Sequence, residues 1–415
     1  MSSLYMKRML AYTLWIRTRL LPSPHGTDTL PGQAGPRRDP CRIPAVIPTP
    51  VPSAGLLERR RMNLGTSVAH REGVLIDASE LAGLLTAARL LPADPRQAGS
   101  AAAHAPDSGE ASGPVPDPVT VAVPVPVLVL DATVALSSPA HDGDYRAASG
   151  ADAWAGAHIP GSRHVDLLTT FTDPTAPYHF AHPSRDTTRR ELASLGADER
   201  TTVVLYDQGS LQWAARLWWV LRDAGVRARV LDGGLPAWTD AGLPVASLTT
   251  ASSAAPSGGT ARPPTGEPFP RAAAGDDTRP SLWIDKDGAR TVSEGRASGI
   301  LVCALGAAHF EGTTPTRYSR RGRIPGSVSL PAQDFLDGDG RLLADPDLSA
   351  RAARLPDRNA GPVVLYCGGG ISASLSALAL TLAGVDSLVM YDGSLEEWTA
   401  DPALPLLTGV ARGAV

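Results

Sequence analysis

An internal repeat limits the folds open to this chain more than any other feature. Residues 201–238 align with residues 361–398, because the tetrapeptide VVLY, an Asp-Gly pair and a Trp recur in the same order. A short upstream motif recurs too, as HIPGS at 158–162 and RIPGS at 323–327. Self-similarity at a long period indicates a duplicated structural unit. We therefore expect the 415 residues to contain two copies of one domain.

Strand and helix patterns alternate within each copy. Short apolar runs such as TVVLYD and PVVLYC are typical of central parallel strands that are covered on both faces. The segments that follow carry apolar residues at helical spacing and end at Gly225 and Gly384, which suit helix C-termini. The expected fold class is α/β, with two tandem domains, each a parallel sheet covered by helices on both faces.

Shifts in composition predict the domain boundaries. Pro, Gly and Arg are abundant from about residue 22 to 61, so this region is expected to be disordered. A start at Met62 is a hypothesis that N-terminal sequencing would test. An Ala-, Pro- and Gly-rich insertion and an aperiodic linker follow further along the chain. The predicted segments are an extension at 1–69, a first domain at 70–246 with a disordered insertion at about 92–118, a linker at 247–280 and a second domain at 281–407.

Charge and cysteine content exclude several classes of protein. The net charge is −4 and no basic stripe is present, so a nucleic-acid partner is not expected. No run of about 18 apolar residues occurs, so no membrane partner is expected. The three cysteines, Cys41, Cys303 and Cys367, argue against a disulfide framework and favour a reducing, cytoplasmic location.

A lone thiol stands where the second VVLY strand meets a glycine loop, in the sequence VVLYCGGGIS. Glycines can adopt backbone angles that turn several N–H groups toward one point, and the helix that follows adds its positive dipole end. Such a nest stabilises an anion, so a Cys367 thiolate is expected to be stabilised and reactive. The predicted anion loop comprises Gly368, Gly369, Gly370, Ile371 and Ser372, whose hydroxyl is expected to donate a further hydrogen bond.

The sequence allows two other interpretations of this thiol. Cys367 is a buried structural residue in the first of them, but the strand–Cys–Gly–helix context disfavours that. In the second the chain is a cysteine phosphatase, which needs an arginine to close the loop on phosphate. Ser372 and Ala373 occupy the candidate positions, so phosphatase chemistry is not expected.

The motifs CGGGIS, YDGSLEEW, LDGGLPAW, HIPGS and RIPGS resemble those of tandem-domain rhodaneses, a family that includes thiosulfate and 3-mercaptopyruvate sulfurtransferases. The resemblance spans about residues 70–405. It implies a non-catalytic first rhodanese-like domain and a catalytic second one, and Asp207 indeed stands at the position of Cys367. The Asp207 loop lacks the three glycines, so we expect no nest there.

The resemblance also implies a mechanism. A Cys367 persulfide would carry sulfur from a small-molecule donor to a thiol or cyanide acceptor, with no metal and no organic cofactor. The resemblance also implies two arginines that bind the donor. Arg317 matches the second of them, whereas His309 stands where the first is usual and departs from that pattern. His158 is implied as a proton relay at the domain interface and Tyr178 as a cleft residue.

The departure at His309 and a change in a second motif favour a second function. Cys303 and Leu305 replace the Asp and Arg of a usual DAR motif, and Arg323 replaces a histidine. Cys303 itself is expected to be a buried strand residue. The alternative function is a non-catalytic or redox-sensing rhodanese-like protein with an oxidisable Cys367. Because Gly368 and Gly369 replace the cations of thiosulfate-type members, 3-mercaptopyruvate is the expected donor.

Overall fold

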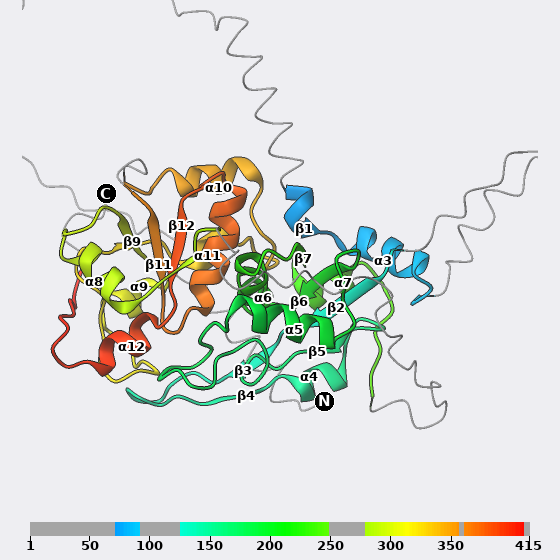
Figure 1. The fold of residues 1–415 in the computed structure, drawn as a ribbon, viewed down its shortest axis with the longest axis horizontal. Helices are drawn as coiled ribbons and strands as arrows, with labels where there is room; N and C mark the ends of the chain where they lie inside the picture. The colour runs from blue at the N-terminus through cyan, green and yellow to red at the C-terminus, as the bar shows by residue number, and fades with distance from the viewer. Residues whose placement is uncertain (1–70, 92–124, 249–278, 357–360, 411–415) are drawn as a thin grey trace, which may run out of the picture. The chain divides into compact units, whose positions relative to one another are not determined.

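The computed structural model describes residues 71–91, 125–248, 279–356 and 361–410 (Figure 1). The predicted extension, the insertion and nearly all of the linker lie outside these ranges, so their boundaries stay predictions. No helix in the described ranges is long and apolar enough to cross a membrane.

The first copy contains a five-stranded parallel sheet of order β1-β7-β6-β2-β5. Helices α3 and α7 share a core with one face of this sheet, and α5 and α6 share a core with the other. A separate antiparallel hairpin, β3 with β4, follows strand β2. The elements are β1 (Leu75–Ile76), α3 (Ala78–Ala87), β2 (Val127–Asp131), β3 (Val134–Leu136), β4 (Ala147–Ser149), α4 (Ala151–Gly156), β5 (Arg163–His164), α5 (Arg185–Ser194), β6 (Thr202–Tyr206), α6 (Gln212–Asp223), β7 (Ala228–Leu231) and α7 (Gly234–Asp240).

The second copy repeats this sheet, with the order β10-β9-β11-β12-β8 and all strands parallel. Helices α10 and α11 share a core with one face, and α8 and α12 with the other. The elements are β8 (Trp283–Ile284), α8 (Lys286–Ser293), β9 (Ile300–Cys303), α9 (Ala307–Phe310), β10 (Val328–Ser329), the 3-10 helix η1 (Ala332–Phe335), α10 (Asp345–Ala352), β11 (Val363–Tyr366), α11 (Ile371–Leu382), β12 (Leu388–Tyr391) and α12 (Ser394–Ala400). The predicted α/β class with two covered parallel sheets is confirmed.

Equivalent hydrogen bonds in the two copies show why the repeated motifs recur. The Tyr206 hydroxyl, at the end of β6, lies 2.9 Å from the Ser162 hydroxyl of HIPGS. The Tyr366 hydroxyl, at the end of β11, donates to the Ser327 hydroxyl of RIPGS at 2.7 Å. Each VVLY tyrosine therefore fixes the IPGS turn of its own copy.

The main apolar core belongs to both copies at once. Alternate residues of the central strands point to opposite faces, so Leu205 and Leu365 enter one shared cluster. Val204 and Val364 point the other way, into two separate outer clusters. Helices α6 and α11 pack side by side within the shared cluster (Figure 1). This arrangement brings the N-terminal end of α6 beside the N-terminal end of α11.

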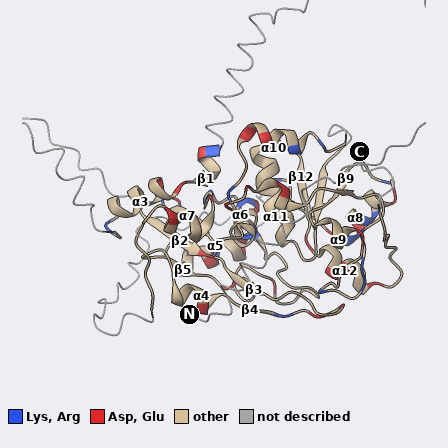
Figure 2. Cartoon of the chain, turned by 180° about the vertical axis from the view of Figure 1, so that it is seen from behind, with Lys and Arg blue, Asp and Glu red and all other residues tan. Residues whose placement is uncertain are grey.

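The repeated Asp-Gly pairs link the two copies by polar contacts. Asp232 accepts the backbone N–H of Leu342 at 2.8 Å, and Asp392 accepts that of His182 at 2.7 Å. Asp392 also pairs with Arg216 of α6 at 2.7 Å, and both side chains are almost fully buried. Outside this buried pair, acidic and basic residues are scattered over both copies (Figure 2).

Candidate active site

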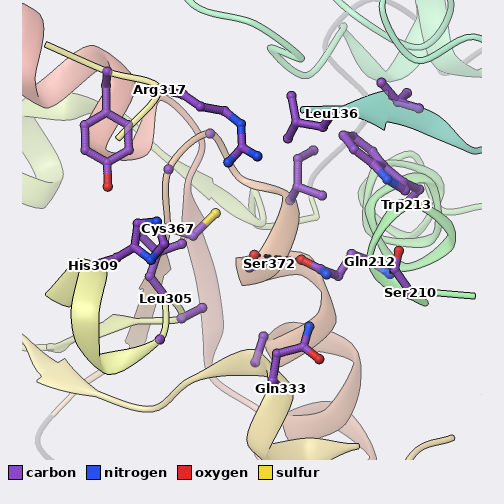
Figure 3. A pocket seen from close by; sticks show the side chains of 18 of the residues that line it. Leu136, Ser210, Gln212, Trp213, Leu305, His309, Arg317, Gln333, Cys367 and Ser372 are labelled. Carbon is purple, nitrogen blue, oxygen red and sulfur yellow. Dashed lines mark hydrogen bonds between the residues drawn. The ribbon is translucent and has the colours of Figure 1, made fainter. Parts of the chain in front are cut away.

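Cys367 lies directly after strand β11 and before helix α11, as predicted. Its side chain is buried, yet it lines a cavity of about 410 Å³ at the boundary of the two copies (Figure 3). Gly370 caps the helix with a φ of 78°, in the left-handed region that glycine tolerates best. The strand–thiol–glycine–helix arrangement expected from the sequence is therefore present.

The loop N–H groups divide into two sets. The Ser394 hydroxyl accepts the N–H groups of Cys367 at 3.1 Å and Gly370 at 3.2 Å, so these two do not face the cavity. Within the described ranges, no protein acceptor takes the N–H groups of Gly368, Gly369 or Ile371. First-turn helical N–H groups have no intrahelical partner, and Ile371 begins α11. These free donors and the α11 dipole can stabilise an anion beside Cys367.

The Ser372 hydroxyl does not serve the loop as expected. It donates to the side-chain carbonyl of Gln212 at 2.7 Å, across the boundary between the copies (Figure 3). The reason is the packing of α6 against α11, which places Gln212 opposite Ser372. Ser372 lines the cavity and links the two helices, but its proton is already used.

Arg317 supplies positive charge to the cavity. Its Nε and Nη2 atoms donate to the Ser137 carbonyl at 3.0 and 2.7 Å. The guanidinium and the Cys367 sulfur extend into the same space (Figure 3). Partial burial lowers the pKa of Arg317, but an arginine keeps its charge at any physiological pH.

His309 also lines the cavity, on the short helix α9. Burial, together with the nearby Arg317 charge, lowers the pKa of its imidazole. The ring is therefore neutral at neutral pH, so His309 adds positive charge to the cavity only in acid.

Two residues implied by the resemblance are absent from the described cavity lining. The His158 Nδ1 atom lies 2.8 Å from the Trp154 carbonyl, and its ring stacks on the Trp154 indole. Tyr178 lies beside Asp392 and Glu397, where burial raises the pKa of its phenol. Motif position within the first domain does not determine which side chains reach the second.

Several cavity residues from the first copy were not identified from the sequence. No local motif marks these residues as site residues. The described residues that the first copy contributes are Val134, Leu136, Tyr145, Ser210, Gln212 and Trp213. The second copy adds Ala304, Leu305, Gly306, Tyr318, Ala332 and Gln333 to the residues discussed above.

The loop between β3 and β4 connects these two sets. Gly143 donates its N–H to the Thr316 carbonyl at 3.0 Å. Asp142 accepts the Thr316 N–H at 3.0 Å and pairs with Arg321 at 2.8 Å. The loop therefore binds the chain on either side of Arg317 and fixes the part of the cavity wall that carries Arg317.

The equivalent loop of the first copy surrounds the side chain of Asp207. The Asp207 Oδ1 atom accepts the N–H groups of Gly209, Ser210 and Leu211 at 2.9 to 3.0 Å. Its Oδ2 atom accepts the N–H groups of Trp213 and Ala214 at 3.0 and 3.3 Å. The expectation that this loop forms no nest is wrong, because Gly209 and Leu211 supply the positive φ angles.

Cys303 is confirmed as a buried strand residue. It lies in β9 with no exposed surface, and burial raises the pKa of its thiol to about 12. A thiol of that kind is inert at neutral pH.

Comparison with known proteins identifies relatives of this chain. The Rhodanese-like domain family matches residues 144–241 and 306–401. A Pseudomonas aeruginosa protein named "Probable 3-mercaptopyruvate sulfurtransferase" is 34% identical over 68% of this chain and 93% of its own length. The Arabidopsis thaliana "Thiosulfate/3-mercaptopyruvate sulfurtransferase 1, mitochondrial" is 30% identical over 60% of this chain and 67% of its own. The crystal structure of SseA from Escherichia coli, from work on 3-mercaptopyruvate sulfotransferases, aligns with a TM-score of 0.51 at 25% identity, covering 65% of this chain and 92% of that one.

Proposed function

Since the chain belongs to the tandem-domain rhodanese family of sulfurtransferases, we propose that it transfers a sulfane sulfur from 3-mercaptopyruvate, through a persulfide on Cys367, to a thiol or cyanide. Three observations support this proposal: the cavity position of Cys367, the free loop donors and the single cation opposite them.

In the first half-reaction the Cys367 thiolate attacks the donor sulfur. An S–S bond forms while the C–S bond of the donor breaks, and the electron pair leaves with the enolate of pyruvate. The enolate takes a proton and departs as pyruvate. The free N–H groups of Gly368, Gly369 and Ile371 would stabilise the sulfur anion before and after the transfer.

In the second half-reaction an acceptor thiolate or cyanide attacks the outer sulfur of the persulfide. The S–S bond breaks and its electron pair returns to the Cys367 sulfur. The product is a persulfide of the acceptor thiol or thiocyanate. The two half-reactions predict ping-pong kinetics.

One observation carries the choice of donor: of the described residues that line the cavity, Arg317 alone is a lysine or arginine. One guanidinium can pair with the single carboxylate of 3-mercaptopyruvate. Thiosulfate brings two charges into a partly desolvated site, and the neutral His309 compensates neither.

A measurement of intact mass with each donor tests the mechanism. The wild-type protein should gain one sulfur atom from 3-mercaptopyruvate, and peptide mapping should place it on Cys367. Cys367→Ser should gain none, whereas Cys303→Ser, a matched control with a buried thiol, should load normally. Sulfur on Cys367→Ser would disprove the mechanism. Oxidation of Cys367 by peroxide, with no sulfur gained from either donor, would favour the redox-sensing alternative.

A paired steady-state assay tests the donor. With the same acceptor, kcat/KM should be higher for 3-mercaptopyruvate than for thiosulfate. A clear preference for thiosulfate would overturn the assignment of the donor but not the Cys367 chemistry.

A further inference from the structure

The proposed first half-reaction requires a group that can donate a hydrogen bond to the oxygen of the departing enolate. Breaking the C–S bond places negative charge on the ketone oxygen of the donor. Arg317 is occupied by the carboxylate in the proposed binding mode. His158, the residue that the family resemblance suggests as a relay, bonds the Trp154 carbonyl and does not line the cavity. A different hydrogen-bond donor is therefore needed for the ketone oxygen.

Tyr145 has the geometry of such a hydrogen-bond donor. It lines the cavity, and no described residue hydrogen-bonds its phenol oxygen. A Cβ atom at Gly369 would lie 3.9 Å from that oxygen, so the hydroxyl stands beside the loop two residues after Cys367. Burial raises the pKa of Tyr145, and the phenol keeps its proton at neutral pH.

The ring of Tyr145 is positioned by two residues, one from each copy. Its ring stacks on the His179 imidazole at 3.9 Å between centroids, with the planes only 7° apart. His179 Nδ1 lies 2.5 Å from a carboxylate oxygen of Glu396, on helix α12 of the second copy. The Glu396 N–H donates to the Gly368 carbonyl at 2.8 Å. The anion loop, Glu396, His179 and Tyr145 therefore form one connected chain of contacts.

The second carboxylate oxygen of Glu396 faces the same place as the phenol. It is buried, no described group hydrogen-bonds it, and it lies 3.3 Å from the Cβ position of Gly369. A larger residue than glycine at 369 would press against this carboxylate. The absence of a side chain at Gly369 leaves room for both groups at the edge of the donor site.

We propose that Tyr145 donates a hydrogen bond to the ketone oxygen of 3-mercaptopyruvate, and that His179 and Glu396 are the positioning residues that hold its ring. The bond strengthens as the C–S bond breaks and the electron pair moves onto that oxygen. Solvent water then protonates the methylene carbon, and pyruvate leaves. The inference rests on the proposed function, and it concerns this donor alone, since thiosulfate has no ketone oxygen.

Single-turnover loading of Cys367, followed by quenched intact mass, tests the role of Tyr145. Tyr145→Phe keeps the stacked ring and removes only the hydroxyl. Loading from 3-mercaptopyruvate should slow about 100-fold, the usual effect of removing one such donor, while loading from thiosulfate should keep its wild-type rate. Equal slowing with both donors, or no slowing with either, would overturn the inference. A wild-type protein that loads from neither donor would instead refute the proposed function.

Substitutions of His179 and Glu396 test whether these residues position the Tyr145 ring. His179→Ala should lower kcat for 3-mercaptopyruvate about 10-fold with little change in KM, whereas His179→Phe, which restores a stacked ring, should recover most of it. Glu396→Gln should behave like the wild type because its amide oxygen can still accept from His179, and Glu396→Ala should resemble His179→Ala. The matched control is His141→Ala, an exposed histidine of the β3–β4 loop that carries Tyr145. Unchanged kcat in His179→Ala, or equal losses with thiosulfate, would exclude a positioning role.

Discussion

Asp207 and Cys367 end equivalent strands and give the two copies different chemistry. Both follow a VVLY strand and precede a helix, and both side chains are buried. The Asp207 carboxylate accepts five backbone N–H groups and so fills its own nest. Cys367 leaves free donors beside a cavity. The same local backbone therefore surrounds a carboxylate in one copy and, in our proposal, stabilises a reacting sulfur in the other.

Asp207→Ala is expected to destabilise the protein because it leaves those five N–H groups buried without an acceptor. The free energy of unfolding should fall by about 3 kcal/mol, measured by urea denaturation. Asp77→Ala is the matched control, since this exposed carboxylate caps α3 through one N–H and should cost about 1 kcal/mol. Equal losses in the two variants would show that the nest does not depend on its carboxylate.

At the scale of elements, the sequence predicts the features that are formed by residues adjacent in the chain. Strand β11, the Cys367 loop and α11 follow one another directly, so periodicity and glycine content were enough to place the thiol at a helix N-terminus. The C-terminal glycines Gly225 and Gly384 were likewise found at positive φ, just after α6 and α11. These features depend on local backbone preferences, which a single sequence carries.

Contacts between the copies were not predictable in the same way. Tyr145 reaches the cavity only because the β3–β4 loop crosses to the second copy, and nothing in its neighbouring residues records that destination. His158, which the resemblance implies as a relay, likewise lies outside the described lining of the cavity. The Ser372 hydroxyl was assigned to the sulfur because Gln212, its actual partner, lies 160 positions away in the chain.

Asp142→Ala tests whether the β3–β4 loop fixes the donor site. The variant loses the Thr316 and Arg321 contacts, so the wall that carries Arg317 should loosen. Because exposed ion pairs are weak, KM for 3-mercaptopyruvate should rise about threefold to tenfold with little loss of stability. Steady-state kinetics and a thermal melt measure the two effects. The control is Glu294→Ala, which removes exposed pairs on α8; an equal rise in its KM would rule out a specific role for the loop.

At the scale of the whole molecule, the described parts of the two copies share one apolar core. Their shared cluster contains the inner faces of both sheets together with α6 and α11. The cavity also takes its lining from both copies, so the first copy is required for the site although its own loop carries no thiol.

Arg216 and Asp392 provide the sharpest test of this shared core. The guanidinium pairs with Asp392 at 2.7 Å, donates to the Phe180 carbonyl and lies 4.9 Å from the centre of the Trp283 ring. Arg216→Met keeps much of the volume but leaves a buried carboxylate without its cation. The free energy of unfolding should fall by about 3 to 5 kcal/mol, and Asp392→Asn in the same chain should restore part of it because the remaining charge is removed.

Calorimetry distinguishes one cooperative unit from two. Both wild type and Arg216→Met should unfold in a single transition that involves both copies, because the cluster cannot lose one half and keep the other buried. Arg290→Met, which breaks an exposed pair on α8, should leave the midpoint unchanged. Two separate transitions in the wild type would show that the copies fold independently. A lowered midpoint in Arg290→Met as large as that in Arg216→Met would show that the cost is not specific to the buried pair.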